Sequence, residues 1–147
     1  MQFDRVLAKY ETALAPTFNN TILTVVNYAT AVYDPWALVA TGAGWVFTAP
    51  RQGFYQIYAS LMFQSYNGWA DGESSALYIY LNGTPISIVD RQDLGSASAI
   101  FRMMHGATLV NMAAGDTLQV RAVQNSGANL NLHNQAAYNY VDIFLVK

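Results

Sequence analysis

The sequence predicts an all-β protein whose strands form an antiparallel sandwich or barrel. From Thr21 to the C-terminus, short apolar runs rich in aromatic and β-branched residues recur at regular spacing. Gly, Pro, Asn and Asp cluster between these runs, as they do in tight turns. No helical pattern of apolar residues separates one run from the next, which argues against alternating strands and helices around a parallel sheet.

The start of the chain shows a different pattern. Apolar residues follow a spacing of four, three and four, at Phe3, Leu7, Tyr10 and Leu14, and Pro16 ends the pattern. This spacing predicts a helix over Phe3–Ala15. We expect residues 1–20 to be a helical or extended segment and residues 21–147 to be the head domain. The first segment would be the end of a trimeric stalk, or it would pack on the domain or be disordered.

The strands expected after this segment are bounded by turn residues such as Asp34-Pro35, Asp71-Gly72, Asn82-Gly83 and Gly115-Asp116. In chain order they are roughly Ile22–Ala29, Ala43–Phe47, Phe54–Gln64, Ser75–Leu81, Ile86–Val89, Ser98–Met104, Thr108–Met112, Thr117–Gln124 and Tyr138–Val146.

Some of these strands carry large apolar side chains on both faces. In Phe54–Gln64 one face holds Tyr55, Ile57, Ala59, Leu61 and Phe63, and the other holds Phe54, Tyr58 and Met62. The last strand repeats the feature, with Tyr138, Tyr140 and Phe144 opposite Val141, Ile143 and Leu145. Thr117–Gln124 instead alternates apolar and polar residues. We therefore expect one sheet to be covered by something outside the subunit.

The composition agrees with this expectation. Apolar residues make up 53% of the chain and charged residues only 11%, against about 25% in a typical domain. No apolar run approaches the ~18 residues of a membrane-spanning helix, so we expect an oligomer and no membrane insertion. The seven Lys and Arg residues are scattered, which argues against nucleic-acid binding. The absence of cysteine excludes disulfides and thiol catalysis, and no secretory signal is visible at the N-terminus.

Several motifs resemble those of one family. The run Thr41-Gly42, Phe47-Thr48-Ala49-Pro50 and Gly53-Phe54-Tyr55 is similar to a signature of the globular head of the q subunit of complement component one. That head is related in fold to tumour necrosis factor. The match continues, in order, through Tyr33-Asp34, Leu81-Asn82-Gly83, Val110, Met112, Gly115-Asp116, Leu118 and the aromatic-aliphatic strand Tyr140–Val146.

This resemblance implies an antiparallel jelly-roll β-sandwich of about ten strands that assembles as a homotrimer. Most motif residues would be structural, namely Gly42, Phe47, Pro50, Gly53, Tyr55, Gly115 and Asp116. The two-faced strands would contact neighbouring subunits through Phe54, Tyr58, Met62, Tyr138, Tyr140, Asp142 and Phe144. Asp142 stands where the family usually has glycine, and no collagen-like segment precedes the head.

Asp142 would therefore face the three-fold axis, where three carboxylates repel one another. We expect hydrogen bonds from tyrosine hydroxyls or water to accommodate them, with an axial cation as the alternative.

The residues that carry chemistry favour binding over catalysis. His105 and His133 lack a defensible third zinc ligand, and no serine lies in a nucleophile motif. We therefore expect no enzyme activity. The loop from Tyr66 to Ser74 combines an aromatic ring with carboxylates and amides, which suits saccharide binding. Its ligand-binding candidates are Tyr66, Trp69, Asp71 and Glu73. Asp71 and Glu73 are also weak candidates for calcium, and no other cofactor is expected.

We interpret the chain as a non-enzymatic trimeric head for binding or assembly. The lack of cysteine is compatible with a virion component that folds in a bacterial cytoplasm. There it would be a fibre tip or surface decoration that engages a host-surface polysaccharide or receptor. One alternative is a secreted recognition head of complement or cytokine type. The other is a carbohydrate-active hydrolase on the same scaffold.

Overall fold

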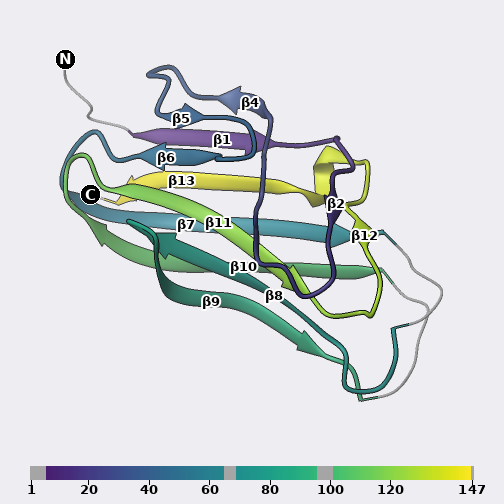
Figure 1. Cartoon of the computed structure of the whole chain (residues 1–147). Coiled ribbons are helices and arrows are strands. Elements are labelled where there is room, and N and C mark those ends of the chain that lie inside the picture. The colour runs from purple at the N-terminus through teal and green to yellow at the C-terminus, as the bar shows by residue number, and fades with distance from the viewer. Residues whose placement is uncertain (1–5, 65–68, 96–100, 147) are drawn as a thin grey trace.

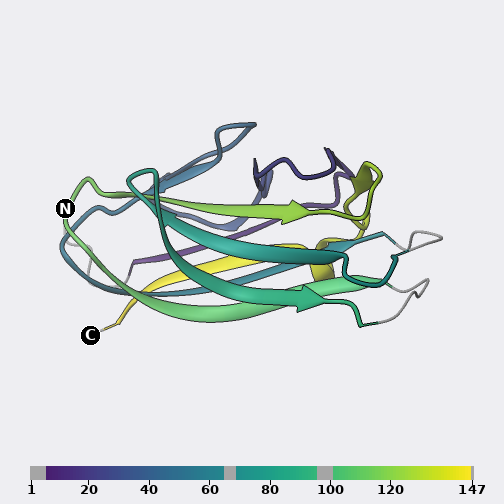
Figure 2. The same ribbon diagram turned by 60° about the horizontal axis from the view of Figure 1, so that its bottom comes forward.

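The protein is a sandwich of two antiparallel sheets (Figures 1 and 2). The computed structural model describes residues 6–64, 69–95 and 101–146. One sheet has five strands in the order β10-β7-β13-β1-β4. The other has the order β5-β6-β11-β8-β9, with β3 also paired to β11, and β2 and β12 form a separate small pair. The expected all-β sandwich is confirmed.

The strand bounds follow the turn residues in most places. The strands are β1 (Leu7–Glu11), β2 (Thr17–Phe18), β3 (Thr24–Val25), β4 (Thr30–Tyr33), β5 (Val39–Ala40), β6 (Val46–Thr48), β7 (Gly53–Phe63), β8 (Ser74–Leu81), β9 (Thr84–Asp93), β10 (Arg102–Met112), β11 (Thr117–Gln124), β12 (Leu130–Asn131) and β13 (Tyr140–Val146). A 3-10 turn, η1 (Ala136–Tyr138), precedes β13.

The helix expected over Phe3–Ala15 is wrong for the residues that the structure describes. Leu7–Glu11 is strand β1, paired on one side with β13 and on the other with β4. Val6, Ala8 and Tyr10 are buried, so the relevant period is two and not three to four. An isolated helix of this length is only marginally stable. As an extended strand, the same segment instead pairs its backbone hydrogen-bonding groups with those of β13. Phe3 lies outside the described residues.

Two further expectations need correction. The break expected between Ser98–Met104 and Thr108–Met112 is absent, because β10 runs through Gly106. A Cβ at Gly106 would lie 2.3 Å from the backbone oxygen of Val89 on β9. The glycine therefore allows β9 and β10 to approach closely at the edge of the sandwich, and it makes no turn. Tyr138 lies in η1 and not in the last strand.

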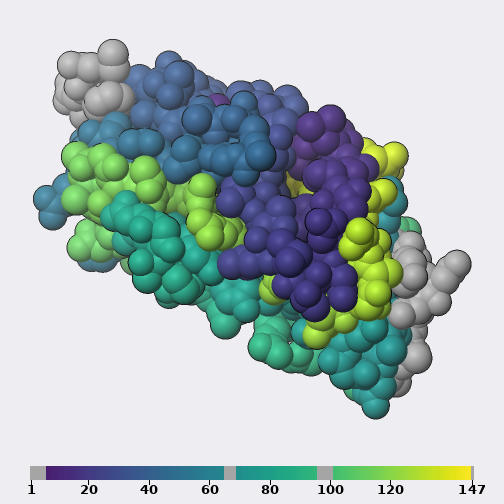
Figure 3. Space-filling view, in the orientation of Figure 1, coloured from purple at the N-terminus to yellow at the C-terminus, as the bar shows by residue number. Residues whose placement is uncertain are grey.

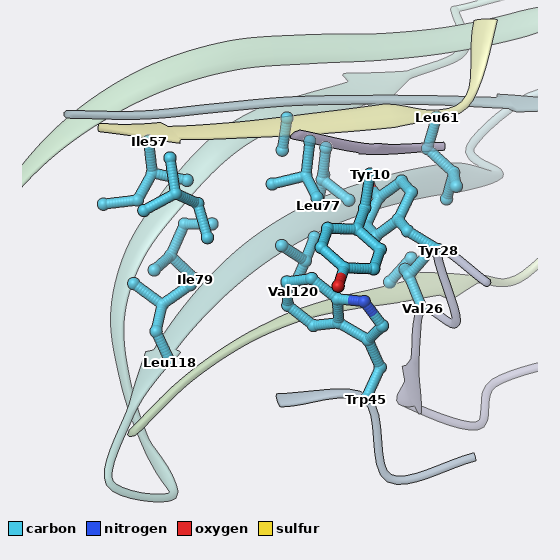
Figure 4. Packing of buried hydrophobic residues seen from close by; sticks show 14 of the residues in the cluster. Tyr10, Val26, Tyr28, Trp45, Ile57, Leu61, Leu77, Ile79, Leu118 and Val120 are labelled. Atoms are coloured by element: carbon cyan, nitrogen blue, oxygen red, sulfur yellow. The ribbon is translucent and has the colours of Figure 1, made fainter. Parts of the chain in front are cut away.

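Aromatic side chains fill the middle of the core (Figure 4). Trp45, Tyr10 and Tyr28 come from different segments, and both tyrosine rings meet the indole edge-to-face, with centroids 6.2 and 5.7 Å away. Such pairs contribute about 0.5–1.5 kcal/mol each beyond their burial. The hydroxyl of Tyr10 donates to Asp34 Oδ2 at 2.8 Å. Aliphatic residues of both sheets continue the core on either side of this cluster, including Ile57, Leu61, Leu77, Ile79, Leu118 and Val120.

Several motif residues make contacts that hold the fold together. Ala49, within the Phe-Thr-Ala-Pro run, exchanges backbone hydrogen bonds with Gly115 and Asp116. The carboxylate of Asp116 accepts from the Ala113 amide at 2.7 Å and from Asn82 Nδ2 at 2.9 Å. These contacts join three motifs that lie far apart in the sequence. Phe47 packs edge-to-face on Tyr55, whose hydroxyl donates to the Arg51 carbonyl. Among the described residues, no helix is long and apolar enough to span a membrane.

Candidate functional site on the five-stranded sheet

The outward side of the five-stranded sheet is the first candidate site. We call it the aromatic face, and define it by the residues of β1, β7, β10 and β13 that point away from the core. The antiparallel register places these residues in rows across the sheet. One row runs Leu109, Gln56, Phe144 and Leu7, and the next runs Ala107, Tyr58, Asp142 and Lys9.

Large apolar side chains of this face are uncovered in the single subunit. Phe54 is 53% exposed, Phe144 41% and Leu109 54%. Their chain neighbours Tyr55, Ile143 and Val110 are buried in the core, so these strands do carry apolar residues on both sides. Val146 and Leu7 extend the exposed apolar surface on β13 and β1. A patch of this kind is unusual on a monomer and marks an interaction surface.

Six of the seven residues expected at a subunit contact lie on this face. They are Phe54, Tyr58, Met62, Tyr140, Asp142 and Phe144. The seventh, Tyr138, lies in η1 and packs edge-to-face on His133, with ring centroids 5.0 Å apart. Sequence reasoning missed Leu7, Leu109 and Val146. The alternation of side chains within their strands indicates that Leu109 and Val146 point outward. Leu7 lies in the segment for which the sequence predicts a helix.

A row of rings forms the middle of the face. Tyr58 of β7 stacks on Tyr140 of β13, with centroids 5.9 Å apart and an interplanar angle of 15°. On its other side Tyr58 stacks on His105 of β10 at 6.5 Å. Burial, followed by the neighbouring Tyr58, raises the pKa of the Tyr140 hydroxyl. The stack therefore presents a flat, mainly apolar surface with polar edges.

Asp142 has a charged partner that the sequence did not indicate. Lys9 Nζ of β1 lies 3.5 Å from Asp142 Oδ1 and 5.3 Å from the centre of the Tyr140 ring. Among the residues that the structure describes, no tyrosine hydroxyl donates to Asp142, and the Asp142 Oδ1 atom is buried without a hydrogen bond. Lys9 reaches Asp142 because β1 pairs directly with β13. Lys9 therefore gives the carboxylate a cationic partner within the subunit.

The loop expected to bind saccharides has a different arrangement. Trp69 has no exposed surface, so its ring is not available to stack on a sugar, and that expectation is wrong for this residue. Asp71 is exposed, whereas Glu73 Oε2 accepts a hydrogen bond from the Ala70 amide at 2.6 Å. Tyr66 lies outside the described residues. In the part of the chain that the structure describes, no three His, Asp or Glu side chains gather as metal ligands.

The outward side of the six-stranded sheet carries a second group of aromatic residues. Tyr78 and Tyr80 of β8 meet edge-to-face at 6.4 Å, and the Arg121 guanidinium lies 4.1 Å from the centre of the Tyr80 ring. Two hydrogen bonds to Gln119 Oε1, of 3.1 and 2.7 Å, orient this guanidinium. Tyr78 borders a hollow of about 250 Å³ with Arg91 and a hollow of about 350 Å³ with Ile86 and Ile88.

Figure 3 views the molecule from this side, with β8 and β11 in teal and green beside the purple and blue N-terminal segments. Little of the yellow last strand, β13, is visible in this view. We call this outward side of the six-stranded sheet, with Tyr78, Tyr80 and Arg121, the Tyr78 surface. The aromatic face and the Tyr78 surface are on opposite sides of the sandwich, because they belong to different sheets.

The fold is that of a tumour necrosis factor-like jelly roll. The chain is similar to Eiger, a tumour necrosis factor of S. frugiperda, with a TM-score of 0.66, 14% identity, and 97% of this chain and 93% of that chain covered. It is also similar to murine APRIL at pH 5.0, with a TM-score of 0.64, 12% identity, and 97% of this chain and 99% of that chain covered. The globular domain of zebrafish complement 1qA is similar with a TM-score of 0.63, 10% identity, and 97% of this chain and 98% of that chain covered.

No protein-family model matches the chain, and no curated protein matches it either. At these identities the likeness concerns the fold. It agrees with the jelly-roll sandwich that the motif resemblance implies.

Proposed function

We propose that this protein is a non-enzymatic binding head that assembles as a homotrimer through the aromatic face. The observation that carries the proposal is the exposure of five large apolar side chains on one side of one sheet, at Leu7, Phe54, Leu109, Phe144 and Val146. In the family that the motifs resemble, the corresponding sheet surrounds the three-fold axis. The fold and the uncovered face therefore support the same assembly.

The energetics favour association. Burying apolar surface stabilises by about 25 cal/mol per Å², which is about 1–2 kcal/mol for a large side chain exposed as these are. Each subunit brings several such side chains, together with the Tyr58–Tyr140 stack. Their sum over the three subunits is of the same order as the cost of lost freedom, which is roughly 4–15 kcal/mol for each of the two association steps. Lys9 keeps the Asp142 carboxylate compensated near the axis.

We further propose that the ligand binds on the Tyr78 surface. In a trimer built on the aromatic face, the outward side of the six-stranded sheet stays free. The half-buried rings of Tyr78 and Tyr80 offer part of their surface to the apolar faces of sugars, and the oriented donors of Arg121 suit hydroxyl or carboxylate groups. This surface replaces the buried Trp69 as the place where a host-surface polysaccharide or receptor would be engaged.

The setting that we propose is a virion surface, with the head as a fibre tip or decoration. The absence of cysteine supports folding in a reducing compartment. The secreted recognition head is the alternative. The likeness to a tumour necrosis factor and to a complement head favours that alternative more than it favours a hydrolase.

The first experiment is the mass in solution, measured by light scattering behind a sizing column at low micromolar concentration. We expect three times the 16.2 kDa subunit mass, stable to dilution. A stable monomer would refute the trimer. A glycan screen then tests the ligand, with Tyr78→Ala as the binding variant and Phe101→Ala as the control. Glycan binding that Tyr78→Ala leaves intact would refute the proposed surface without affecting the trimer.

A further inference from the structure

The hollow of about 250 Å³ on the Tyr78 surface lies beside short side chains of β8. Ser74, Ala76 and Tyr78 share the outward side of this strand, because alternate side chains of a strand point the same way and the residues between these three are buried. Ser74 and Ala76 are short, so the surface falls away next to the larger ring of Tyr78. The lining residues are Thr21, Ser74, Ala76, Tyr78, Arg91, Val123, Gln124 and Asn125.

Three strands and the segment before β3 form the hollow. Val123, Ala76 and Arg91 are cross-strand neighbours in one row over β11, β8 and β9. Thr21 has a φ of 63°, a left-handed conformation that a β-branched residue rarely adopts. Its backbone N–H donates to the Gln124 carbonyl at 2.7 Å, which holds Thr21 beside β11. Strained residues persist where the surrounding structure fixes them, and they cluster at binding sites.

The polar groups around the hollow suit hydroxyl ligands. Asn125 Oδ1 accepts a hydrogen bond from the Ser74 amide, and the NH2 group of Asn125 remains as a donor. The Asn125 backbone N–H donates to the Ser74 carbonyl at 3.0 Å, so this residue is held at two points. The hydroxyls of Thr21, Ser74 and Tyr78 can each donate and accept. The hydroxyl groups of a sugar need this mixture of donors and acceptors.

The charge of Arg91 is already matched by a carboxylate. Arg91 Nε and Nη2 donate to the two Asp93 oxygens at distances of 3.1 and 3.2 Å. Asp93 is the cross-strand neighbour of Ser74, so it stands at the edge of the hollow. A carboxylate brought to Arg91 would also meet Asp93, and a like charge at a contact is costly. A neutral hydroxyl can bind beside the same pair without that cost.

We propose that this hollow is the subsite for one neutral pyranose residue of a glycan, and that Asp93, paired with Arg91, selects against acidic sugars. The inference rests on the proposed function, because it takes a glycan as the ligand of the Tyr78 surface. The ring of Tyr78 contacts the apolar face of the sugar. Sites for drug-sized ligands measure roughly 300–1,000 Å³, so this smaller hollow takes a single ring. Tyr78 also borders the hollow of about 350 Å³ beside Pro85 and Ile86, where the glycan chain continues.

The test is calorimetric titration of the full chain with a broad panel of neutral glycans. Each glycan is paired with the analogue in which a carboxylate replaces the C6 hydroxymethyl group. The unmodified chain should bind a neutral glycan at least about 10-fold more tightly than its acidic analogue. Ala76→Val places two methyl groups in the hollow and should weaken neutral binding by about 10-fold or more. Ala31→Val is the matched control, because Ala31 is exposed on β4 of the other sheet.

Asp93→Asn is a second variant, and it does not depend on whether Ala76→Val folds. The Asp93 side chain is 59% exposed, so the substitution leaves the core intact. It should reduce the preference for the neutral glycan to less than about 3-fold, because the repelling charge is gone. Asp71→Asn is its control. Asp71 is also exposed and lies outside the lining of the hollow, so this variant should keep the full preference.

The outcomes separate this inference from the proposed function. A panel in which nothing binds would refute the glycan ligand, and this subsite with it. Binding that Tyr78→Ala abolishes but Ala76→Val leaves unchanged would overturn the hollow alone. A preference of the unmodified chain for the acidic analogues would overturn the role of Asp93.

Discussion

Phe144 offers the sharpest test of the aromatic face, because the proposed trimer would cover it whereas the subunit core does not depend on it. Its side chain is 41% exposed on β13, in the row that joins Leu109 to Leu7. A phenylalanine buries about 150–250 Å² when fully covered. The exposed part therefore amounts to about 80 Å², or about 2 kcal/mol per subunit at about 25 cal/mol per Å².

Phe144→Ala should thus weaken a trimer by about 6 kcal/mol, which is about four powers of ten in the association constant. The midpoint concentration of a three-subunit equilibrium varies with the square root of that constant. The variant should therefore dissociate at about 100-fold higher protein concentration than the unmodified chain. Light scattering or sedimentation over a dilution series measures this midpoint.

The control for this experiment is Ile88→Ala. Ile88 is 55% exposed, but it lies on β9, outside the aromatic face. The Ile88→Ala variant should leave the midpoint concentration unchanged. Both variants should change the unfolding free energy of the isolated subunit only a little. The reasoning is refuted if Phe144→Ala and Ile88→Ala dissociate at the same concentration.

The remaining predictions concern stability. Burial, together with the Asp34 hydrogen bond and charge, raises the pKa of Tyr10 to about 12. The stability that Tyr10 contributes is therefore present below its unfolded pKa of about 10 and is lost as pH rises toward 12. Tyr10→Phe should lower the unfolding free energy by about 1 kcal/mol at pH 7 and flatten this alkaline loss; an unchanged alkaline limb in pH-dependent denaturation contradicts it. Hydrogen bonds from Asn82 and then from the Ala113 amide lower the pKa of Asp116, so its contribution is present above about pH 4 and is lost as pH falls through the folded pKa. Asp116→Asn should make the acid limb shallower, and a parallel acid limb would rule this out. Gly106→Ala should destabilise by about 1–3 kcal/mol or more in urea unfolding, because the new Cβ meets the Val89 oxygen; Gly95→Ala, with open space around it, is the control. Asp142→Asn should leave Lys9 without its charged partner and lower the melting temperature of the trimer; no change in that temperature or in its pH dependence would show that the pair has no role.

Much of the architecture was accessible from local patterns. The alternation in Gly53–Phe63 and in Tyr140–Val146 depends on a side-chain period of two, which holds for any strand in any sheet. The turn residues around Asn82-Gly83 and Gly115-Asp116 bounded β8 and β11 closely. They did not bound β9, which runs over Thr84–Asp93 and so extends beyond the expected Ile86–Val89 at both ends. The exposed second face followed from the same alternation, and so did six of its seven expected contact residues.

Other features depended on pairings between distant segments. The spacing of Leu7, Tyr10 and Leu14 is compatible with a helix, and the alternation of Val6, Ala8 and Tyr10 with a strand. The choice rests on the backbone of β13, near the other end of the chain. The same pairing brings Lys9 to Asp142. Trp69 packs against Arg102 of β10, a contact that no pattern around the tryptophan indicates.

By itself, then, the sequence determined the all-β class, the two-faced strands and the motif turns, because each depends on the conformation of a few consecutive residues. The tertiary structure decided that β1 is a strand, that Lys9 compensates Asp142, and that Trp69 and Arg102 lie inside the sandwich. These features depend on which distant strands meet, and the free energy that selects one pairing is shared across both sheets.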